Sequence, residues 1–257
     1  MFSSANLAMP LHYLMREFTV RSYEVDFNCE LRLPALFNHL QDVAWEQAEG
    51  MGCGWQALQQ QGWLWVLSRI DLQVLRLPRW TDTVRLYTWP RGIDGVFALR
   101  DFELQTPGGD VLAQATSSWL VLSAQSHRPM RIASLFAERR FVEQSTLGRN
   151  ADRLVLPADA LPEATDEQHV VLGDIDMNQH VNNVRYIDMA CNTYGREQFE
   201  RFSPSGIAVN FNAESQMGET LRLMRYASAP NEQLVAISRA SDGKNACTLR
   251  FCWSERG

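Results

Sequence analysis

The side chains best suited to chemistry gather in one short stretch, Asp176-Met177-Asn178-Gln179-His180. A histidine titrates near neutral pH and can act as a general acid or base. A carboxylate can orient its ring, and a side-chain amide can donate a hydrogen bond to a carbonyl oxygen. These residue types therefore fit acyl transfer. The structural alternative is that Asp176 and Asn178 are turn and helix-cap residues, and that His180 is an ordinary core or surface histidine.

The stretch has a counterpart earlier in the chain, which indicates an internal duplication. Asp26-Phe27-Asn28-Cys29-Glu30 matches it at a spacing of 176 − 26 = 150 residues. A helical pattern follows in both places, from about Leu33 to Gly50 and from about Val181 to Gly195. Asp-x-Asn occurs in both copies, but the first copy has Glu30 where the second has His180. Only the second copy therefore offers a group that titrates near neutral pH at this position.

Two further pairs of segments extend the duplication. Residues Ile70 to Tyr87 match Ile207 to Met224 at 207 − 70 = 137, and Val111 to Trp119 match Asn245 to Trp253 at 253 − 119 = 134. These segments alternate as paired strands around turns do. Each copy therefore predicts an α+β unit in which a curved antiparallel sheet wraps one long helix. We expect the sheets of the two units to pair.

These matches suggest how the chain is organised. We assign residues 1–15 to a loose N-terminal leader, 16–133 to the first unit, 134–168 to a linker and 169–257 to the second unit. The linker range contains Pro157, Pro162 and an acidic run, which are typical of a connecting segment. The 257 residues are enough for two units that each bury a core.

The composition excludes several classes of function. Hydrophobic residues make up 46% and charged residues 21%, and no apolar run is long enough to span a bilayer, so we expect a cytoplasmic protein. A net charge of −6 argues against nucleic acid as a partner. The five cysteines are scattered without C-x-x-C spacing, so the sequence indicates no disulfide framework and no metal site. No cofactor is implied.

The segment Asp174 to Ile187, DIDMNQHVNNVRYI, resembles the signature of the acyl-acyl carrier protein (acyl-ACP) thioesterases of plants and bacteria. The resemblance extends over nearly the whole chain from about residue 16. The first-half segments that carry it, in the family's order, are Arg21–Glu24, Asn38–Asp42, Trp65–Arg69, Pro78–Val84 and Ala115–Val121. It implies a tandem double hotdog fold. It also implies hydrolysis of the thioester between a fatty acyl chain and acyl carrier protein, in fatty acid biosynthesis.

The resemblance implies four catalytic positions, which are Asp176, Asn178, His180 and Glu214, and it places Glu214 in the strand that follows the helix. In that case a carboxylate, Asp176 or Glu214, activates water together with His180, while Asn178 and helix N-terminal amides polarise the thioester. Direct attack by Asp176 to form an acyl anhydride is the competing route.

The repeat pairs Glu214 with Leu77, so the second copy has a carboxylate where the first has an apolar residue. This is a second position at which only the second copy has a reactive side chain. The structural alternative is an exposed strand glutamate. Plant members have a cysteine directly after this glutamate. Here the residue is Ser215, so a cysteine nucleophile is not expected. A serine would react only if a base activated it.

Substrate binding is assigned by resemblance and by charge. The first unit is expected to hold the acyl chain in an apolar tunnel, where three tryptophans either shorten the tunnel or are simply core aromatics. These are Trp45, Trp63 and Trp65. Five arginines are candidate docking points for the acidic carrier protein, with a solvated surface turn as the alternative for most of them. These are Arg128, Arg131, Arg139, Arg140 and Arg185.

Three other functions remain open from the sequence. A hotdog thioesterase can act on acyl-CoA instead of acyl-ACP, and a hotdog hydratase also uses an acid with a histidine, although less of its motif is present. A non-catalytic acyl-binding or regulatory protein could use the same fold, but the joint retention of Asp176, Asn178, His180 and Glu214 argues against it. A homodimer is a further prediction.

Overall fold

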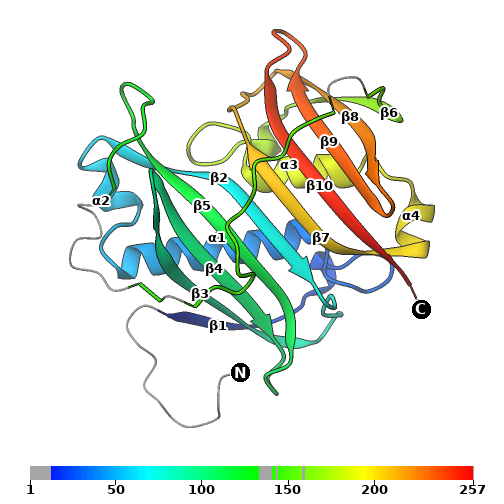
Figure 1. Cartoon of the computed structure of the whole chain (residues 1–257), viewed down its shortest axis with the longest axis horizontal. Coiled ribbons are helices and arrows are strands. Elements are labelled where there is room, and N and C mark those ends of the chain that lie inside the picture. The colour runs from blue at the N-terminus through cyan, green and yellow to red at the C-terminus, as the bar shows by residue number, and fades with distance from the viewer. Residues whose placement is uncertain (1–12, 133–140, 143, 158–159, 257) are drawn as a thin grey trace. The chain divides into compact units, whose positions relative to one another are not determined.

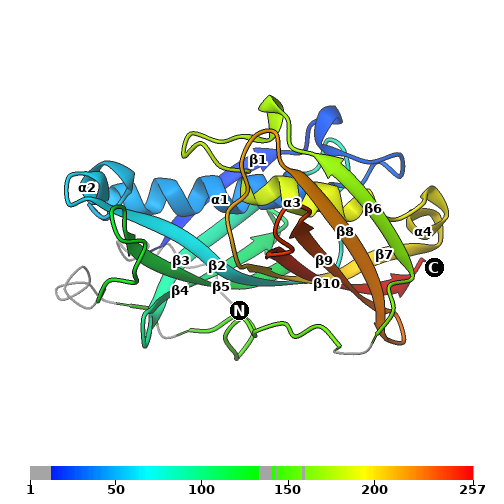
Figure 2. The ribbon, with the colours of Figure 1, turned by 90° about the horizontal axis from the view of Figure 1, so that it is seen from above.

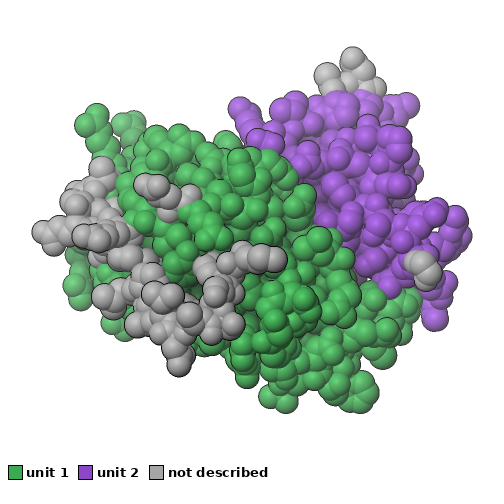
Figure 3. Space-filling model, turned by 60° about the horizontal axis from the view of Figure 1, so that its bottom comes forward, with its two compact units in different colours: residues 1–151 green, residues 152–257 purple. Residues whose placement is uncertain are grey.

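The structure, a computed structural model, describes residues 13–132, 141–142, 144–157 and 160–256. The chain forms two compact units, Met1–Ala151 and Asp152–Gly257, which are coloured separately in Figure 3. Each unit contains an antiparallel sheet and a helix that follows its first strand (Figure 1). The α+β class predicted from the duplication is confirmed.

The described residues of unit 1 form five strands in the order β1-β3-β4-β5-β2, with every neighbouring pair antiparallel. Its elements are β1 (Leu14–Thr19), a 3-10 turn η1 (Ser22–Glu24), α1 (Leu33–Gly50), α2 (Trp55–Gln59), β2 (Trp63–Val74), β3 (Thr83–Asp94), β4 (Phe97–Gln105) and β5 (Val111–Ser123). The long helix α1 begins with Pro34 in its first turn, a position where a missing N–H costs nothing.

Unit 2 repeats this arrangement, with the strand order β6-β8-β9-β10-β7. Its elements are β6 (Ala164–His169), a 3-10 turn η3 (Leu172–Asp174), α3 (Asn183–Cys191), α4 (Arg196–Arg201), β7 (Phe202–Phe211), β8 (Thr220–Ala229), β9 (Glu232–Arg239) and β10 (Asn245–Glu255). Each strand of unit 2 has the place that its counterpart has in unit 1. The duplication is therefore present in the topology as well as in the sequence.

Several boundaries differ from the sequence-based prediction. Strand β1 begins at Leu14, inside the range assigned to the leader, and helix α3 begins at Asn183 rather than at Val181. Helix α3 ends at Cys191, four residues before Gly195, because the chain turns there and α4 begins after Gly195. Strand β6 begins at Ala164, inside the range assigned to the linker. Its sequence, ATDEQH, has no apolar alternation, since it is an edge strand in which no residue is buried. Its position could have been read from β1, which lies 164 − 14 = 150 residues earlier.

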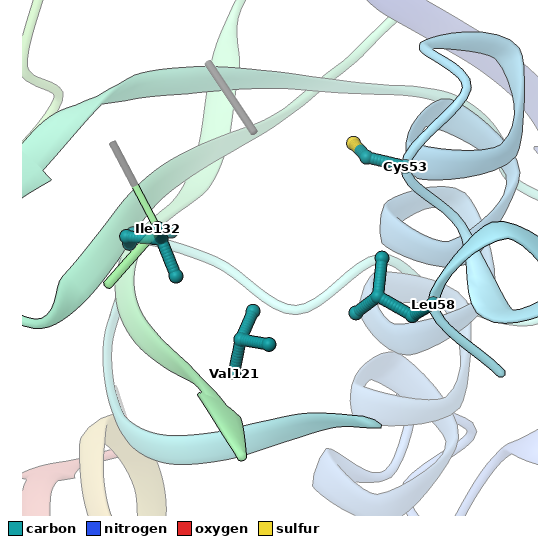
Figure 4. Packing of buried hydrophobic residues seen from close by; sticks show 5 residues of the cluster. Cys53, Leu58, Val121 and Ile132 are labelled. Carbon is teal, nitrogen blue, oxygen red and sulfur yellow. The ribbon is translucent and has the colours of Figure 1, made fainter. Parts of the chain in front are cut away.

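The core of unit 1 lies between α1 and the sheet, and Figure 2 shows α1 running across one face of the strands. The apolar residues of α1 recur every three or four positions, at Leu33, Leu36, Leu40 and Val43, and all four are buried. A second cluster lies near the end of α1 and joins Cys53 and Leu58 to Val121 of β5 and to Ile132 (Figure 4). No helix among the described residues is both long enough and apolar enough to cross a bilayer.

Candidate active site

The Asp176–His180 segment is a tight loop between η3 and α3. The backbone N–H of Asp176 donates to the carbonyl oxygen of His180 at 2.9 Å, and the N–H of Gln179 donates to the carbonyl oxygen of Asp176 at 2.9 Å. Gln179 adopts a φ of 66°, in the left-handed region that residues other than glycine rarely occupy. The loop thus brings the backbone of His180 back beside that of Asp176 and leads directly into Val181.

Unit 1 contains the same loop. The Asp26 N–H donates to the Glu30 carbonyl at 2.9 Å, and the Cys29 N–H to the Asp26 carbonyl at 3.0 Å. Cys29 has a φ of 59°, as Gln179 does within a few degrees. The backbone conformation is therefore shared by both copies and does not by itself mark a catalytic loop.

The carboxylate of Asp176 has a structural role in this loop. Its Oδ1 accepts the backbone N–H of Asn178 at 2.8 Å, and Asp26 accepts the N–H of Asn28 at the same distance in unit 1. The side chain of Asn178 is exposed and makes no hydrogen bond to any described residue. Asp176 thus shapes the loop, which leaves the Asn178 amide free to reach a substrate.

The alternative in which Asp176 and Asn178 cap the following helix is wrong. Helix α3 begins three residues after His180, and Asn182 is its N-cap, with Oδ1 accepting the N–H of Val184 at 2.8 Å. The same carboxamide therefore occupies one of the helix N-terminal amides that we expected to polarise a substrate. The pair Asn182-Asn183 before an apolar helical pattern is a sequence signal that could have located this cap.

Glu214 lies opposite the loop, although not in a strand as predicted. Strand β7 ends at Phe211, and Glu214 belongs to the connection between β7 and β8. The N–H of Val181 donates to the carbonyl of Ser215 at 2.9 Å, which fastens this connection to the residue after His180. The Nε2 atom of His180 consequently lies 3.2 Å from Oε2 of Glu214.

The His180–Glu214 pair is accessible to a substrate. The side chain of His180 is 31% exposed and that of Glu214 is 47% exposed. A carboxylate at this distance holds an imidazole in one orientation. In unit 1 the equivalent positions are Glu30 and Leu77, so no such pair exists there.

Ser215 is buried completely, with an exposed fraction of 0%. It lies beside the phenol of Tyr186 on α3, and burial raises the pKa of that phenol. A hydroxyl without solvent access cannot reach a thioester in this conformation. The position that is a cysteine in plant members thus belongs here to the interior of unit 2.

An apolar cavity lies in unit 1 between the C-terminal half of α1 and the sheet. Trp45 and Trp65 line it, whereas Trp63 packs against the cluster around Leu58. The indole N–H of Trp65 donates to the carbonyl of Cys53 at 2.8 Å, which fixes that wall of the cavity.

The wall also contains a cation that the sequence did not reveal. Arg100 of β4 donates to the side-chain oxygen of Gln47 and, at 3.1 Å, to the hydroxyl of Thr88. Burial lowers the pKa of Arg100 to about 10, so the guanidinium stays charged at neutral pH. Arg100 lies in β4 between Leu99 and Asp101, and nothing in its position in the sequence marked it as part of a cavity.

The basic docking candidates fall into three groups. Arg128 and Arg131 are exposed, in the loop after β5, and neither pairs with a carboxylate among the described residues. Arg185 is engaged by Asp174 and Asp188, each at 2.8 Å, so its charge is neutralised. Arg139 and Arg140 lie outside the described residues. Within the described part of the chain, no group of three or more His, Cys, Asp or Glu side chains is placed to hold a metal ion.

Structural comparison defines the class of fold. The 12:0-ACP thioesterase from Umbellularia californica superposes with a TM-score of 0.84 at 23% identity, covering 96% of this chain and 98% of that one. An acyl-ACP thioesterase from Bacteroides thetaiotaomicron superposes with a TM-score of 0.78 at 23% identity, covering 94% and 98%. These similarities show that the chain has the double hotdog fold of these proteins.

Sequence comparison defines the family. The models of the acyl-ACP thioesterase N-terminal and C-terminal domains match residues 12–139 and 161–255. The chain therefore belongs to the acyl-ACP thioesterase family. It is 26% identical to oleoyl-acyl carrier protein thioesterase 2 of Arabidopsis thaliana over 91% of its own length and 68% of that protein. It spans 44–62% of the length of seven other plant thioesterases and hydrolases that it matches.

Proposed function

We propose that this member of the family is a thioester hydrolase that releases a free fatty acid from acyl-ACP and thereby serves fatty acid biosynthesis. The observation that carries the proposal is the His180–Glu214 pair at 3.2 Å, present in unit 2 and replaced by Glu30 and Leu77 in unit 1. Family membership supports the substrate, because the plant relatives are named for acyl-ACP thioesters. Cytoplasmic location and a homodimer stay predictions from the sequence.

In the proposed mechanism His180 is the general base. Its Nε2–H faces Glu214, which leaves the lone pair of Nδ1 to accept a proton from water. The hydroxide attacks the carbonyl carbon, and the exposed amide of Asn178 donates to the oxygen that becomes negative. The C–S bond then breaks, and the imidazolium returns the proton to the departing thiolate sulfur. Asp176 keeps the loop in shape.

Direct attack by Asp176 is less well supported by the geometry, because one of its carboxylate oxygens accepts the Asn178 N–H at 2.8 Å within the loop. That route forms an acyl anhydride on the protein, whereas activated water forms no covalent intermediate. Hydroxylamine added during turnover would convert an Asp176 anhydride into a hydroxamate, which mass spectrometry of the peptide would detect.

The proposed function is tested with a panel of acyl-ACP thioesters of different chain lengths. Purified protein is mixed with each thioester, and the released acids are measured by mass spectrometry. We expect release from at least one acyl-ACP, with a higher kcat/KM than for the same acyl-CoA. Preference for acyl-CoA would favour the alternative carrier, and binding without release would favour a non-catalytic acyl-binding protein.

The apolar cavity of unit 1 is the proposed place of the acyl chain. Its lining by Trp45 and Trp65 and its position beside α1 suit an alkyl chain, which gains by leaving water. Trp63 supports this wall from the neighbouring cluster rather than lining it. The panel of chain lengths therefore also measures how much of the cavity a chain can fill.

Reversing the charges of Arg128 and Arg131 together is expected to raise KM for acyl-ACP about tenfold while leaving kcat nearly unchanged. The reason is that both are exposed cations without a carboxylate partner in the described part of the chain, and the carrier protein is acidic. The measurement is a steady-state comparison of Arg128→Glu/Arg131→Glu with the wild type at two salt concentrations, since salt should shrink the difference.

The matched control for this prediction changes the net charge equally at two other exposed arginines, with Arg76→Glu and Arg153→Glu. If this control raised KM as much as the first variant, the effect would come from overall charge and the docking assignment would fail. The KM for an acyl-CoA substrate should be the same in all three proteins.

A further inference from the structure

The guanidinium of Arg239, at the end of β9, lies beside the backbone of Glu214. Its Nη1 donates to the carbonyl oxygen of Glu214 at 3.3 Å. Asp242 holds the other edge of the same guanidinium, with Nε donating to Oδ1 at 3.1 Å and Nη2 donating to Oδ2. A guanidinium that donates two hydrogen bonds to one carboxylate has little rotational freedom, so the remaining donors of Arg239 point in a fixed direction.

The duplication shows that Arg239 and the acidic residue whose backbone it contacts occur in unit 2 and not at the matching positions of unit 1. Strand β3 pairs Arg85 with Gln105, and β8 pairs Arg222 with Ser238. Since Arg222 corresponds to Arg85 at 222 − 85 = 137, Ser238 corresponds to Gln105 and the next residue, Arg239, to Thr106.

The hairpin turns support this correspondence. In unit 1 the N–H of Gly109 donates to the carbonyl of Thr106, and in unit 2 the N–H of Gly243 donates to that of Arg239, both at 2.9 Å. Thr106 has no long side chain, and the position of Glu214 is the apolar Leu77 in unit 1. Glu214 and the arginine that contacts its backbone carbonyl therefore occur together in unit 2, and both are absent from the matching positions of unit 1.

Glu214 needs such support, because it lies in a connection rather than in a strand. The N–H groups of Asn212 and Ala213 both donate to the carbonyl of Ala246, and the carbonyl of Ser215 accepts the N–H of Val181. Glu214 lies between these two anchors, and its half-exposed side chain begins from a backbone that Arg239 alone contacts through a side chain among the described residues. Rotation of that backbone would turn the carboxylate away from His180.

We propose that Arg239 is a positioning residue for the hydrolysis. By holding the Glu214 carbonyl it directs the Glu214 carboxylate at His180, and Asp242 in turn holds Arg239. Arg239 itself touches neither the substrate nor the reacting atoms. The inference rests on the proposed function, because it gives Arg239 a role through the His180–Glu214 pair.

The test compares Arg239→Met with the wild type on acyl-ACP. Loss of one hydrogen bond that orients a reacting group is expected to lower kcat about tenfold, with KM within twofold of the wild type. Arg239→Lys retains a cationic donor and should recover at least part of the loss. The control is Arg222→Met, which removes another arginine–carboxylate pair of unit 2, with Glu167 at 3.2 Å on the neighbouring strand, and should leave kcat within twofold.

A double-mutant comparison separates positioning from a general effect on the fold. Single-turnover hydrolysis at high protein concentration is measured for Glu214→Ala and for Glu214→Ala with Arg239→Met. If Arg239 acts through Glu214, the second substitution adds no further loss. An additional tenfold loss in this background would overturn the proposal, and so would near-normal kcat in Arg239→Met.

The same set of variants also distinguishes a folding defect of Arg239→Met from a failure of the proposed function. If Arg239→Met is not folded by circular dichroism, Asp242→Asn, which only loosens Arg239, should show a smaller decrease in kcat at unchanged KM, and no decrease would overturn the proposal. If the wild type does not hydrolyse acyl-ACP, or if Glu214→Ala retains full activity, the proposed function fails rather than the assignment of Arg239 alone.

Discussion

Replacing His180 by alanine is expected to lower kcat for acyl-ACP hydrolysis about a thousandfold, which is within the range that a general base contributes. The substitution removes the group that takes the proton from water and later returns it to the thiolate. Because the side chain of His180 is 31% exposed and the loop is held by backbone hydrogen bonds, the fold should remain intact. The measurement is steady-state hydrolysis together with circular dichroism and the thermal midpoint.

The duplication supplies a matched control for this variant. Glu30 has the same place in the corresponding loop of unit 1, so Glu30→Ala truncates a side chain in an equivalent backbone environment. It should retain activity within a fewfold of the wild type. Activity of His180→Ala close to that of Glu30→Ala would remove the histidine from the mechanism.

The second large effect is expected at Glu214. Glu214→Gln preserves the length of the side chain but removes the negative charge, so the amide neither holds His180 in the same way nor stabilises the imidazolium that forms during the reaction. We expect kcat to fall on the order of a hundredfold, with KM nearly unchanged because Glu214 is not part of the apolar cavity.

Ser215→Ala is the companion variant for Glu214→Gln. It removes a buried hydroxyl from the adjacent residue without changing the backbone carbonyl that accepts the Val181 N–H. Its activity should stay within a fewfold of the wild type. A loss in Ser215→Ala as large as in Glu214→Gln would contradict the assignment, since it would restore a nucleophilic role to the residue at the cysteine position.

The architecture could be predicted from the sequence because duplication repeats every signal. Leu33 to Gly50 was predicted as a helix and forms α1. The paired segments that begin at Ile70 and Ile207 each run from one strand into the next, from β2 into β3 in unit 1 and from β7 into β8 in unit 2. The prediction failed for elements of unit 2 whose sequence pattern is weaker than that of their counterparts in unit 1. Strand β6 has a polar sequence at the edge of the sheet, and α3 is half the length of α1.

The candidate site could be predicted only in part. His180 was identified by comparing the two copies, and Glu214 mainly by family resemblance, and their roles stay predictions. Their distance of 3.2 Å depends on how the connection after β7 folds back to Val181, which residue types and spacing do not specify. Arg239 and Asp242 were missed because charged residues at a hairpin turn are ordinarily exposed to solvent and have no further role.

The left-handed residue in each loop, Cys29 in unit 1 and Gln179 in unit 2, has a consequence for how the two halves can diverge. A conformation that is costly for residues other than glycine was kept on both sides, while the side chains beside it changed. In both units the residue after the loop makes the same backbone contact with the connection opposite, Leu31 with Pro78 in unit 1 and Val181 with Ser215 in unit 2. The two loops can therefore differ in their chemistry through their side chains alone, without a change in main-chain conformation.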